Sequence, residues 1–475
     1  MVRAPSTPER SRAPARLRRL PRFAWGAKSR RRTELGLLLF GDVVVVACYV
    51  LVSLGKTAHV PAHVGPFLGI LLGLTLLAHL ANRWLVPNAN PVILPITALL
   101  NGIGYVMIAR WDPGEAKAQA GWTAIGVVLY ILTLLWIQHS RDLDRYRYLL
   151  LLAGVALVLA PLIPHFGESI NGARLWVHVG AKTFQPVEVA KICLCIFFAS
   201  YFAEKKELLS IATARIGNRL VIDPGPLIPV VLAWAFVMLV IGAEKDIGFA
   251  LLIFALFVGL LWISTGRIGY LVFGLVLFAA GAFVASHLLG QVAERISIWL
   301  DPWKSASGNG FQLVQAWFAL GNGGVGGVGL GMGHAGVASV GGGFVPEITS
   351  DMIFVAIGEE LGLMGTSVVV IAFLLLVGSG LRIAQAARSD FSRLVATGLT
   401  LLIGLQAFFI MAGIVRILPL TGITLPFMAY GGSSLIANYV LVALLMRISE
   451  EGATVSAEQP SGVPQPGEAA FVVAG

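Results

Sequence analysis

Long apolar runs dominate this chain and constrain its fold more than any other feature. Apolar residues make up 57% of the 475 positions and the mean hydropathy is +0.83, so a soluble domain would have too little interior to bury them. Runs of about 17 to 25 residues fit helices that cross a hydrocarbon core of about 30 Å. We therefore predict an all-α polytopic membrane protein. Its twelve predicted transmembrane helices lie at residues 35–54, 64–82, 91–109, 121–138, 147–164, 186–203, 225–243, 247–265, 268–289, 353–380, 394–415 and 430–447.

The distribution of basic residues predicts the orientation in the membrane. Eleven of the 34 Lys and Arg lie in residues 1–33, ahead of the first apolar run. With this end inside and twelve spans, the inward segments carry 24 Lys and Arg and the outward segments 9, while Lys191 lies within a span. This bias follows the positive-inside rule, so both termini are predicted to be cytoplasmic. The net charge of +9 then reflects topology, and we predict no nucleic-acid partner.

The chain is predicted to form one membrane domain, at residues 34–449. The basic tail at 1–33 and the tail at 450–475 hold too few apolar residues to fold and are predicted to be disordered cytoplasmic segments. Because further spans follow the first run, we interpret it as an uncleaved anchor. The three cysteines all fall in apolar runs and are interpreted as small buried side chains.

Two predicted loops, 165–185 and 290–351, are long, polar and rich in glycine, and the second separates the ninth and tenth spans. On this topology both are extracellular, as are residues 244–246 and 416–429. Sites usually lie on loops held by a rigid scaffold, so we expect the chemistry on this face. Glycines in 301–343 would let backbone N–H groups approach an anion, but the segment lacks a P-loop signature and we predict a flexible surface loop.

Residues 345–362 contain four acidic side chains where this loop runs into an apolar helix. An unbroken helix from Asp351 would place Glu359 about 12 Å further along its axis and Glu360 on the opposite face. That separation exceeds the span of at most about 9.5 Å that two-carboxylate sugar chemistry uses. We predict that Asp351 is a catalytic carboxylate that acts alone or together with Glu188 or Asp246 from other segments. Glu359 and Glu360 are predicted to stabilise helix packing.

The sixth predicted span opens with FQPVEVAK at residues 184–191. Pro186 suits the first turn of a helix, and Glu188 and Lys191 are then three residues apart on one face. A charge within hydrocarbon costs about 2.5 to 3.5 kcal/mol, so we expect Lys191 to pair with Glu188. The pair is either a structural ion pair or a cation that faces a cavity and binds a pyrophosphate.

Two other outer segments carry candidate polar groups. Residues 244–246 place three charges in a turn, where Asp246 is predicted to cap the next helix. Capping does not exclude a role in the site. Arg174 and Trp176 are predicted to anchor their loop in the headgroup layer and to contact a polar substrate.

Five motifs in this order resemble the SEDS (shape, elongation, division, sporulation) glycosyltransferases of the RodA, FtsW and SpoVE type. They are FQPVEVAK at 184–191, EKDIG at 244–248, LDPW with GNGFQ at 300–312, VPEITSDMIF with GEELG at 345–362, and LPLTGITLPFMAYGGSS at 418–434. The resemblance extends over about residues 90–450. Within the family the chain is most similar to actinobacterial RodA, which has two N-terminal helices ahead of the ten-helix core.

The resemblance implies a peptidoglycan glycosyltransferase that polymerises lipid II, an undecaprenyl-pyrophosphate disaccharide-pentapeptide, for cell-wall elongation, cell shape or division. It also implies a class B penicillin-binding transpeptidase as partner and suggests Mg²⁺ or Mn²⁺, although no ligand cluster is evident. The family's catalytic aspartate falls on Asp351. Substrate-binding residues are expected to be Glu188, Lys191, Asp246, Arg174, Trp176, Gln312 and Arg416. The chain departs from the commonest pattern at Thr349-Ser350, where His-Thr is frequent, and at Phe311, where Tyr is usual.

The expected reaction is an inverting transfer with Asp351 as general base, in which Lys191, Arg174 or Arg416 stabilises the leaving pyrophosphate. Two other functions remain open: a lipid II flippase, and a non-catalytic scaffold for the transpeptidase. A flippase needs polar residues through the depth of the membrane, whereas the ionisable groups here cluster at the outer ends. Asp42, in the first span, is the exception and is interpreted as a local feature.

Overall fold

The computed structural model describes residues 28–59, 64–164, 166–170, 173–180, 182–210, 214–216, 219–221, 225–336 and 344–458. Its α-helices are α1 Lys28–Thr57, α2 Val64–Leu85, α3 Ile93–Trp111, α4 Pro113–Trp136, α5 Arg141–Arg145, α6 Arg147–Leu159, α7 Val187–Ser210, α8 Ile228–Glu244, α9 Ile247–Thr265, α10 Ile268–Leu288, α11 Gly290–Leu300, α12 Phe311–Gly323, α13 Ile353–Gln385, α14 Asp390–Ile414 and α15 Gly432–Glu458. Short 3₁₀ turns are η1 Ala160–Leu162, η2 Gly225–Leu227 and η3 Pro302–Ser305. The strands are β1 Gly167–Ile170, β2 Ala173–Val179, β3 Lys182–Phe184, β4 Ala214–Ile216 and β5 Arg219–Val221.

Each of the twelve predicted spans coincides with a helix. Among the described residues, eight helices are long and apolar enough to cross a membrane, and three further apolar helices, at 69–85, 147–162 and 228–244, are shorter. The remaining helix, α7, carries Glu188 and Lys191 near its start. The all-α, multi-pass architecture is confirmed, and the count of twelve spans stays a prediction.

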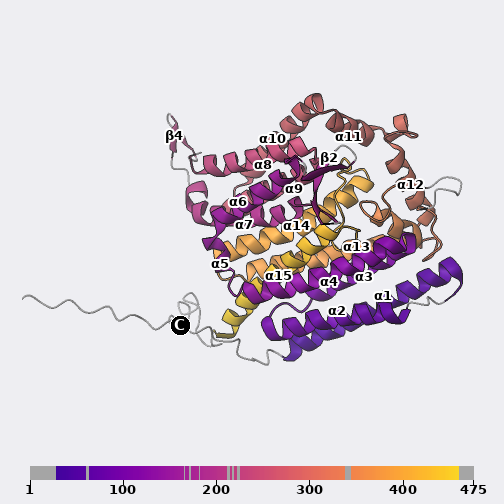
Figure 1. Cartoon of the computed structure of the whole chain (residues 1–475). Helices are drawn as coiled ribbons and strands as arrows, with labels where there is room; N and C mark the ends of the chain where they lie inside the picture. Colours follow the sequence, from indigo (N-terminus) through magenta and orange to yellow (C-terminus); the bar gives the residue numbers. More distant parts are fainter. Residues whose placement is uncertain are drawn as a thin grey trace, which may run out of the picture.

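The long helices run side by side in one bundle (Figure 1). Helices α14 and α15 lie mostly buried within it, whereas α10 is almost wholly exposed. The pair α1 and α2 packs along one edge, beside α3 and α4. Helices α11 and α12 lie at the opposite end of the bundle from the C-terminal end of α15.

The segment 301–343, predicted to be a flexible surface loop, contains regular structure in η3 and α12. Apolar residues of α12 are buried, and the carboxylate of Asp301 accepts the N–H of Trp303 at the start of η3. The glycines gather after α12 in residues 324–336, which we call the Gly-rich segment, and 337–343 lie outside the described residues. The other long loop, 165–185, forms an antiparallel sheet in the order β1-β2-β3, so the loops are not all-α.

The helices at both ends of the chain are longer than predicted. Helix α1 begins inside the predicted basic tail, where Arg31 forms an ion pair with Glu34. Helix α15 continues to Glu458, and the carboxylate of Glu450 accepts hydrogen bonds from the backbone N–H (2.6 Å) and the side-chain amide (3.0 Å) of Asn88. These contacts hold residues in helices that their composition had predicted to be parts of disordered tails. The rest of both predicted tails lies outside the described residues.

A buried polar network joins α1 and α2 to the rest of the bundle at the end opposite α11 and α12. Glu34 is fully buried and accepts hydrogen bonds from Arg31, from His79 (Nδ1, 2.8 Å) and from Asn82 (3.3 Å). The hydroxyl of Tyr130, on α4, donates in turn to Asn82. Because a buried carboxylate is stable only when it is paired and hydrogen-bonded, this network fixes the position of α1.

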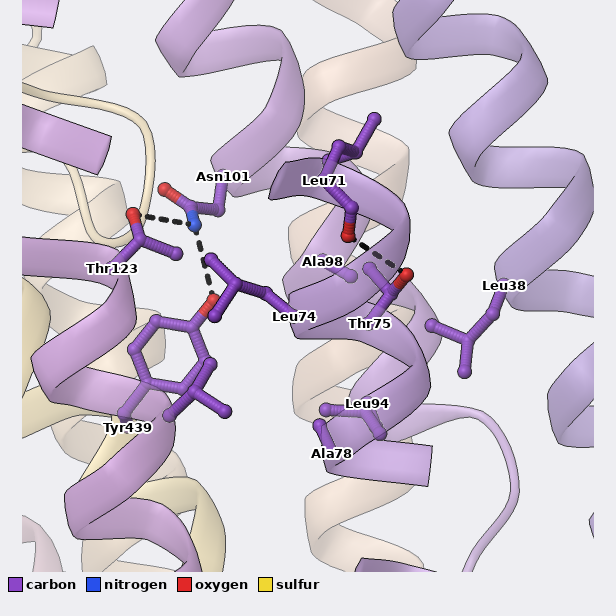
Figure 2. A pocket seen from close by; sticks show the side chains of 11 residues that line it. Leu38, Leu71, Leu74, Thr75, Ala78, Leu94, Ala98, Asn101, Thr123 and Tyr439 are labelled. Carbon is purple, nitrogen blue, oxygen red and sulfur yellow. Dashed lines mark hydrogen bonds between the residues drawn. The ribbon is translucent and has the colours of Figure 1, made fainter. Parts of the chain in front are cut away.

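A small pocket of about 40 Å³ lies between this helix pair and α3, α4 and α15 (Figure 2). The side-chain amide of Asn101 donates there to Thr123 (3.1 Å) and to the Tyr439 hydroxyl (3.0 Å). Thr75 lines the pocket and also donates to Asp42 at 3.0 Å, so Asp42 links α1 to α2. A space of this size holds a few waters at most, which fits a packing interface rather than a path for lipid.

Candidate active site

Asp351 lies in a tight turn that leads into α13. Glu347 occupies the left-handed region (φ 57°), which is uncommon for a residue with a side chain. Its carbonyl accepts the N–H groups of Ser350 (3.1 Å) and Met352 (3.2 Å) and thereby closes the turn. The Asp351 side chain is half-buried, and its Oδ1 atom has no hydrogen-bond partner within the described chain. The turn thus presents one free carboxylate oxygen.

The surroundings of Asp351 give it the acidity of a general base that works near neutral pH. Burial, assisted by the negative charge of Glu347, raises the pKa of Asp351 from 3.8 to about 7. The Arg295 guanidinium and the Ser350 hydroxyl act in the opposite direction. A base whose pKa lies close to the working pH combines a useful ionised fraction with a strong tendency to take a proton.

Arg295, on α11, is the cation that the sequence analysis missed. Its Nη1 atom donates to the carbonyls of Leu420 (3.1 Å) and Thr421 (2.7 Å). Its charge lowers the pKa of both Asp351 and Asp246, so the guanidinium is within electrostatic range of both carboxylates. The sequence signal was the amphipathic pattern of α11, within a segment that we had predicted to be a loop.

Asp246 caps the start of α9, as predicted. Its Oδ1 atom accepts the N–H of Phe249 at 3.0 Å, while its Oδ2 atom has no hydrogen-bond partner among the described residues. Burial raises the pKa of Asp246 to about 6, because it outweighs the opposing effects of the Phe249 N–H and Arg295, and Glu188 adds to the rise. The second acid of the site is therefore buried within electrostatic range of the same arginine as Asp351.

Lys191 and Glu188 form the predicted ion pair, with Nζ and Oε2 2.6 Å apart and both side chains buried. Lys191 also donates to Gln406 (2.8 Å) and Asn438 (3.4 Å). The buried ammonium group is therefore held by one carboxylate, through the ion pair, and by two side-chain amide oxygens, through hydrogen bonds. These contacts agree with the interpretation of Glu188 and Lys191 as a structural ion pair. Binding of a pyrophosphate by Lys191 stays a prediction.

The other predicted substrate-binding residues make different contacts. The amide of Gln312 donates to the carbonyl of Pro346 at 3.3 Å and so braces the turn that carries Asp351. Arg416 donates to backbone carbonyls at the C-terminal end of α11. Arg174 is exposed and Trp176 half-buried on β2, within the separate three-stranded sheet. Of these four, Gln312 has the direct contact with the Asp351 turn.

Glu359 and Glu360 hold the Gly-rich segment against α13. The Oε2 atom of Glu359 accepts the N–H groups of His334 (3.1 Å) and Ala335 (2.9 Å). The Oε2 atom of Glu360 accepts the N–H of Gly331 at 2.8 Å. Both acids therefore support structure, as predicted, but they do so by binding backbone N–H groups of a distant segment.

An open apolar groove of about 570 Å³ runs between α12 and α13. It begins at Phe354, three residues beyond Asp351, and is lined further along by Leu320, Thr366 and Val415.

No group of three or more His, Cys, Asp or Glu side chains able to hold a metal ion occurs in the part of the chain that the structure describes. Mg²⁺ commonly keeps several waters and binds through one or two carboxylates together with substrate phosphates. Asp246 and Asp351 each have one carboxylate oxygen without a hydrogen-bond partner among the described residues, and a carboxylate oxygen is the type of protein ligand that such a cation uses.

The fold and the site together define a polytopic membrane protein with a group of buried and half-buried acids beside the turn that leads into α13. Residues 95–454 match the family model of FtsW, RodA and SpoVE, described as cell cycle proteins. The chain belongs to this family.

Known relatives agree with this assignment over most of the chain. It is 38% identical over 432 residues to the peptidoglycan glycosyltransferase RodA of Mycobacterium tuberculosis (strain H37Rv), covering 89% of this chain and 91% of the relative. Identity to the Mycobacterium leprae protein of the same name is 36%, covering 89% and 90%. A chain solved in a study of how a peptidoglycan synthase complex coordinates polymerization and crosslinking matches with a TM-score of 0.60 and 25% identity, over 76% of this chain and 97% of that one. Thermus thermophilus RodA shares the fold, with a TM-score of 0.53 and 23% identity, over 76% and 96%.

Proposed function

We propose that this protein is a peptidoglycan glycosyltransferase that polymerises lipid II into glycan strands at the outer face of the cytoplasmic membrane. The observation that carries the proposal is the Asp351 carboxylate, which has one unpartnered oxygen and a pKa that burial raises to about 7 against the opposing charge of Arg295. The family and the names of the relatives support the same reaction.

Asp351 acts as the general base. It takes the proton of the sugar 4-hydroxyl of one lipid II while that oxygen forms a bond to the anomeric carbon of the growing chain. The bond from this carbon to the pyrophosphate oxygen breaks with inversion, and the lipid pyrophosphate leaves. Arg295, within electrostatic range of both carboxylates, and Lys191 offset the negative charge that develops on the leaving group. Arg174 and Arg416 are further candidates for contacts with the substrate.

The lipid part of the substrate has a matching surface. The groove between α12 and α13 is apolar, lies along a helix long enough to cross the membrane, and begins next to the catalytic turn. The proposed substrate carries an isoprenoid chain, which is apolar and would suit this groove. We assign the groove to the prenyl chain of lipid II.

Orientation, partner and cation complete the proposal. The excess of Lys and Arg in the other loops supports an outer location for α11, α12 and the Asp351 turn, with both termini cytoplasmic. The related synthase complex supports a class B penicillin-binding transpeptidase as partner. A divalent cation, Mg²⁺ or Mn²⁺, would bind together with the pyrophosphate of the substrate, where Asp246 offers an unpartnered carboxylate oxygen, and would supply positive charge to the leaving group.

One experiment separates this function from the two alternatives. Proteoliposomes that contain the purified protein are supplied with lipid II, with and without the transpeptidase, and glycan product and lipid translocation are measured in the same vesicles. Glycan formation without translocation is the expected result. Translocation without glycan would identify a flippase, and neither activity under any condition would identify a scaffold.

A further inference from the structure

The outer end of α1 is in direct backbone contact with the Gly-rich segment. A Cβ atom on Gly55 would lie 2.1 Å from the carbonyl oxygen of Leu330, and one on Gly331 would lie 2.2 Å from the carbonyl oxygen of Val52. Neither position accepts a side chain unless one of the two backbones moves. The family model begins at residue 95, so this contact joins a helix outside it to a segment inside it.

Polar contacts reinforce the same junction. The Nζ atom of Lys56 donates to the carbonyl of Arg110, at the end of α3, at 3.0 Å. Arg110 donates through Nη2 to the carbonyl of Gly333 at 2.9 Å, and its Nε atom lies 3.3 Å from Oε1 of Glu360. Glu360 also accepts the N–H of Gly331, so α1, α3 and α13 all hold the Gly-rich segment.

The Gly-rich segment is tied to the turn that carries Asp351. Ala335 donates its N–H to Glu359, and its carbonyl accepts the N–H of Val345 at 2.6 Å. Val345 is fully buried and lies six residues before Asp351. A displacement of the Gly-rich segment would therefore pass through Ala335 and Val345 to the catalytic turn.

We propose that α1 is a positioning element for the transferase reaction: Gly55, with Lys56, sets the place of the Gly-rich segment and through it the orientation of Asp351. This inference rests on the proposed function. The buried network around Glu34 fixes α1 about 30 Å away along the helix, at a rise of about 1.5 Å per residue. A side chain at Gly55 thus displaces the Gly-rich segment while α1 stays in place.

The test compares Gly55→Ala with Gly36→Ala, a matched control on the same helix where an added Cβ meets nothing within 4 Å. Initial rates of lipid II polymerisation by the purified full-length proteins give kcat and KM. A misplacement of about 1 Å can cost up to about a hundredfold in rate, so we expect Gly55→Ala to lower kcat by about tenfold or more with little change in KM. Lys56→Met, which removes one hydrogen bond and adds no clash, should lower kcat less.

A second readout does not depend on activity. Hydrogen–deuterium exchange should be faster in Gly55→Ala at the N–H groups of Gly331 and Ala335, which Glu360 and Glu359 accept, and unchanged near Glu34. If Gly55→Ala has the same kcat and the same exchange rates as the wild type, the inference is overturned. It is also overturned if protection from exchange falls uniformly across the protein together with its thermal stability. If the wild type makes no glycan yet the local exchange difference is present, the proposed function fails and the positioning contact stands.

Discussion

The acidity of Asp351 predicts how the polymerisation rate depends on pH. With a pKa of about 7, about nine-tenths of the carboxyl groups are ionised at pH 8 and about one-tenth at pH 6. If Asp351 is the base, kcat should fall about tenfold between these two values and about a hundredfold by pH 5. The assay is the initial rate of glycan formation at saturating lipid II from pH 5 to 9 at constant ionic strength.

Two substitutions should shift the fall of kcat at low pH, the acid limb of the pH profile, in opposite directions. Glu347→Gln removes a negative charge that raises the pKa of Asp351, so the limb should move to lower pH. Arg295→Gln removes a positive charge that lowers it, so the limb should move to higher pH. Arg295→Lys keeps the charge and serves as the control. A rate that is flat from pH 5 to 8, or a shift of both charge-removing variants in the same direction, would refute the assignment of Asp351 as the base.

Three further predictions concern stability and the cation. Lys191→Met leaves the Glu188 charge buried without its partner and should cost about 3 to 5 kcal/mol of folding free energy, seen as a lower Tm, whereas Glu188→Gln combined with Lys191→Met should recover part of the loss. Because the pKa of Asp351 is raised from 3.8 to about 7 in the folded protein, its ionisation destabilises the fold increasingly from about pH 4 to pH 7, by about 4 kcal/mol at the plateau. Asp351→Asn should therefore melt above the wild type at pH 8 and level with it at pH 4; equal Tm values at pH 8 would contradict this. Chelation with EDTA should lower the rate and Mg²⁺ or Mn²⁺ should restore it, and an unaffected rate would remove the cation from the account.

The parts of the site that depend on neighbours in the sequence were predictable. Apolar runs located the helices because membrane thickness fixes their length. The pairing of Glu188 with Lys191 and the cap by Asp246 both follow from positions three residues apart on a helix, and the structure confirms both contacts.

The parts that depend on how the outer segments fold back were not predictable. Arg295 donates hydrogen bonds to the carbonyls of Leu420 and Thr421, which lie more than 100 residues further along the chain, and no local sequence pattern predicts that contact. Glu359 and Glu360 were assigned to helix packing, but both accept backbone N–H groups, which every residue except proline carries, and Glu360 also pairs with Arg110. The sequence therefore identified the two acids but did not predict that they bind the Gly-rich segment.

The most direct test of the account is polymerisation of lipid II by purified Asp351→Asn protein. The substitution keeps the size of the side chain and removes the proton acceptor. We predict that the variant retains its fold, judged by Tm and by hydrogen–deuterium exchange, and forms no glycan polymer. Undiminished polymer from the folded Asp351→Asn protein would contradict the central claim.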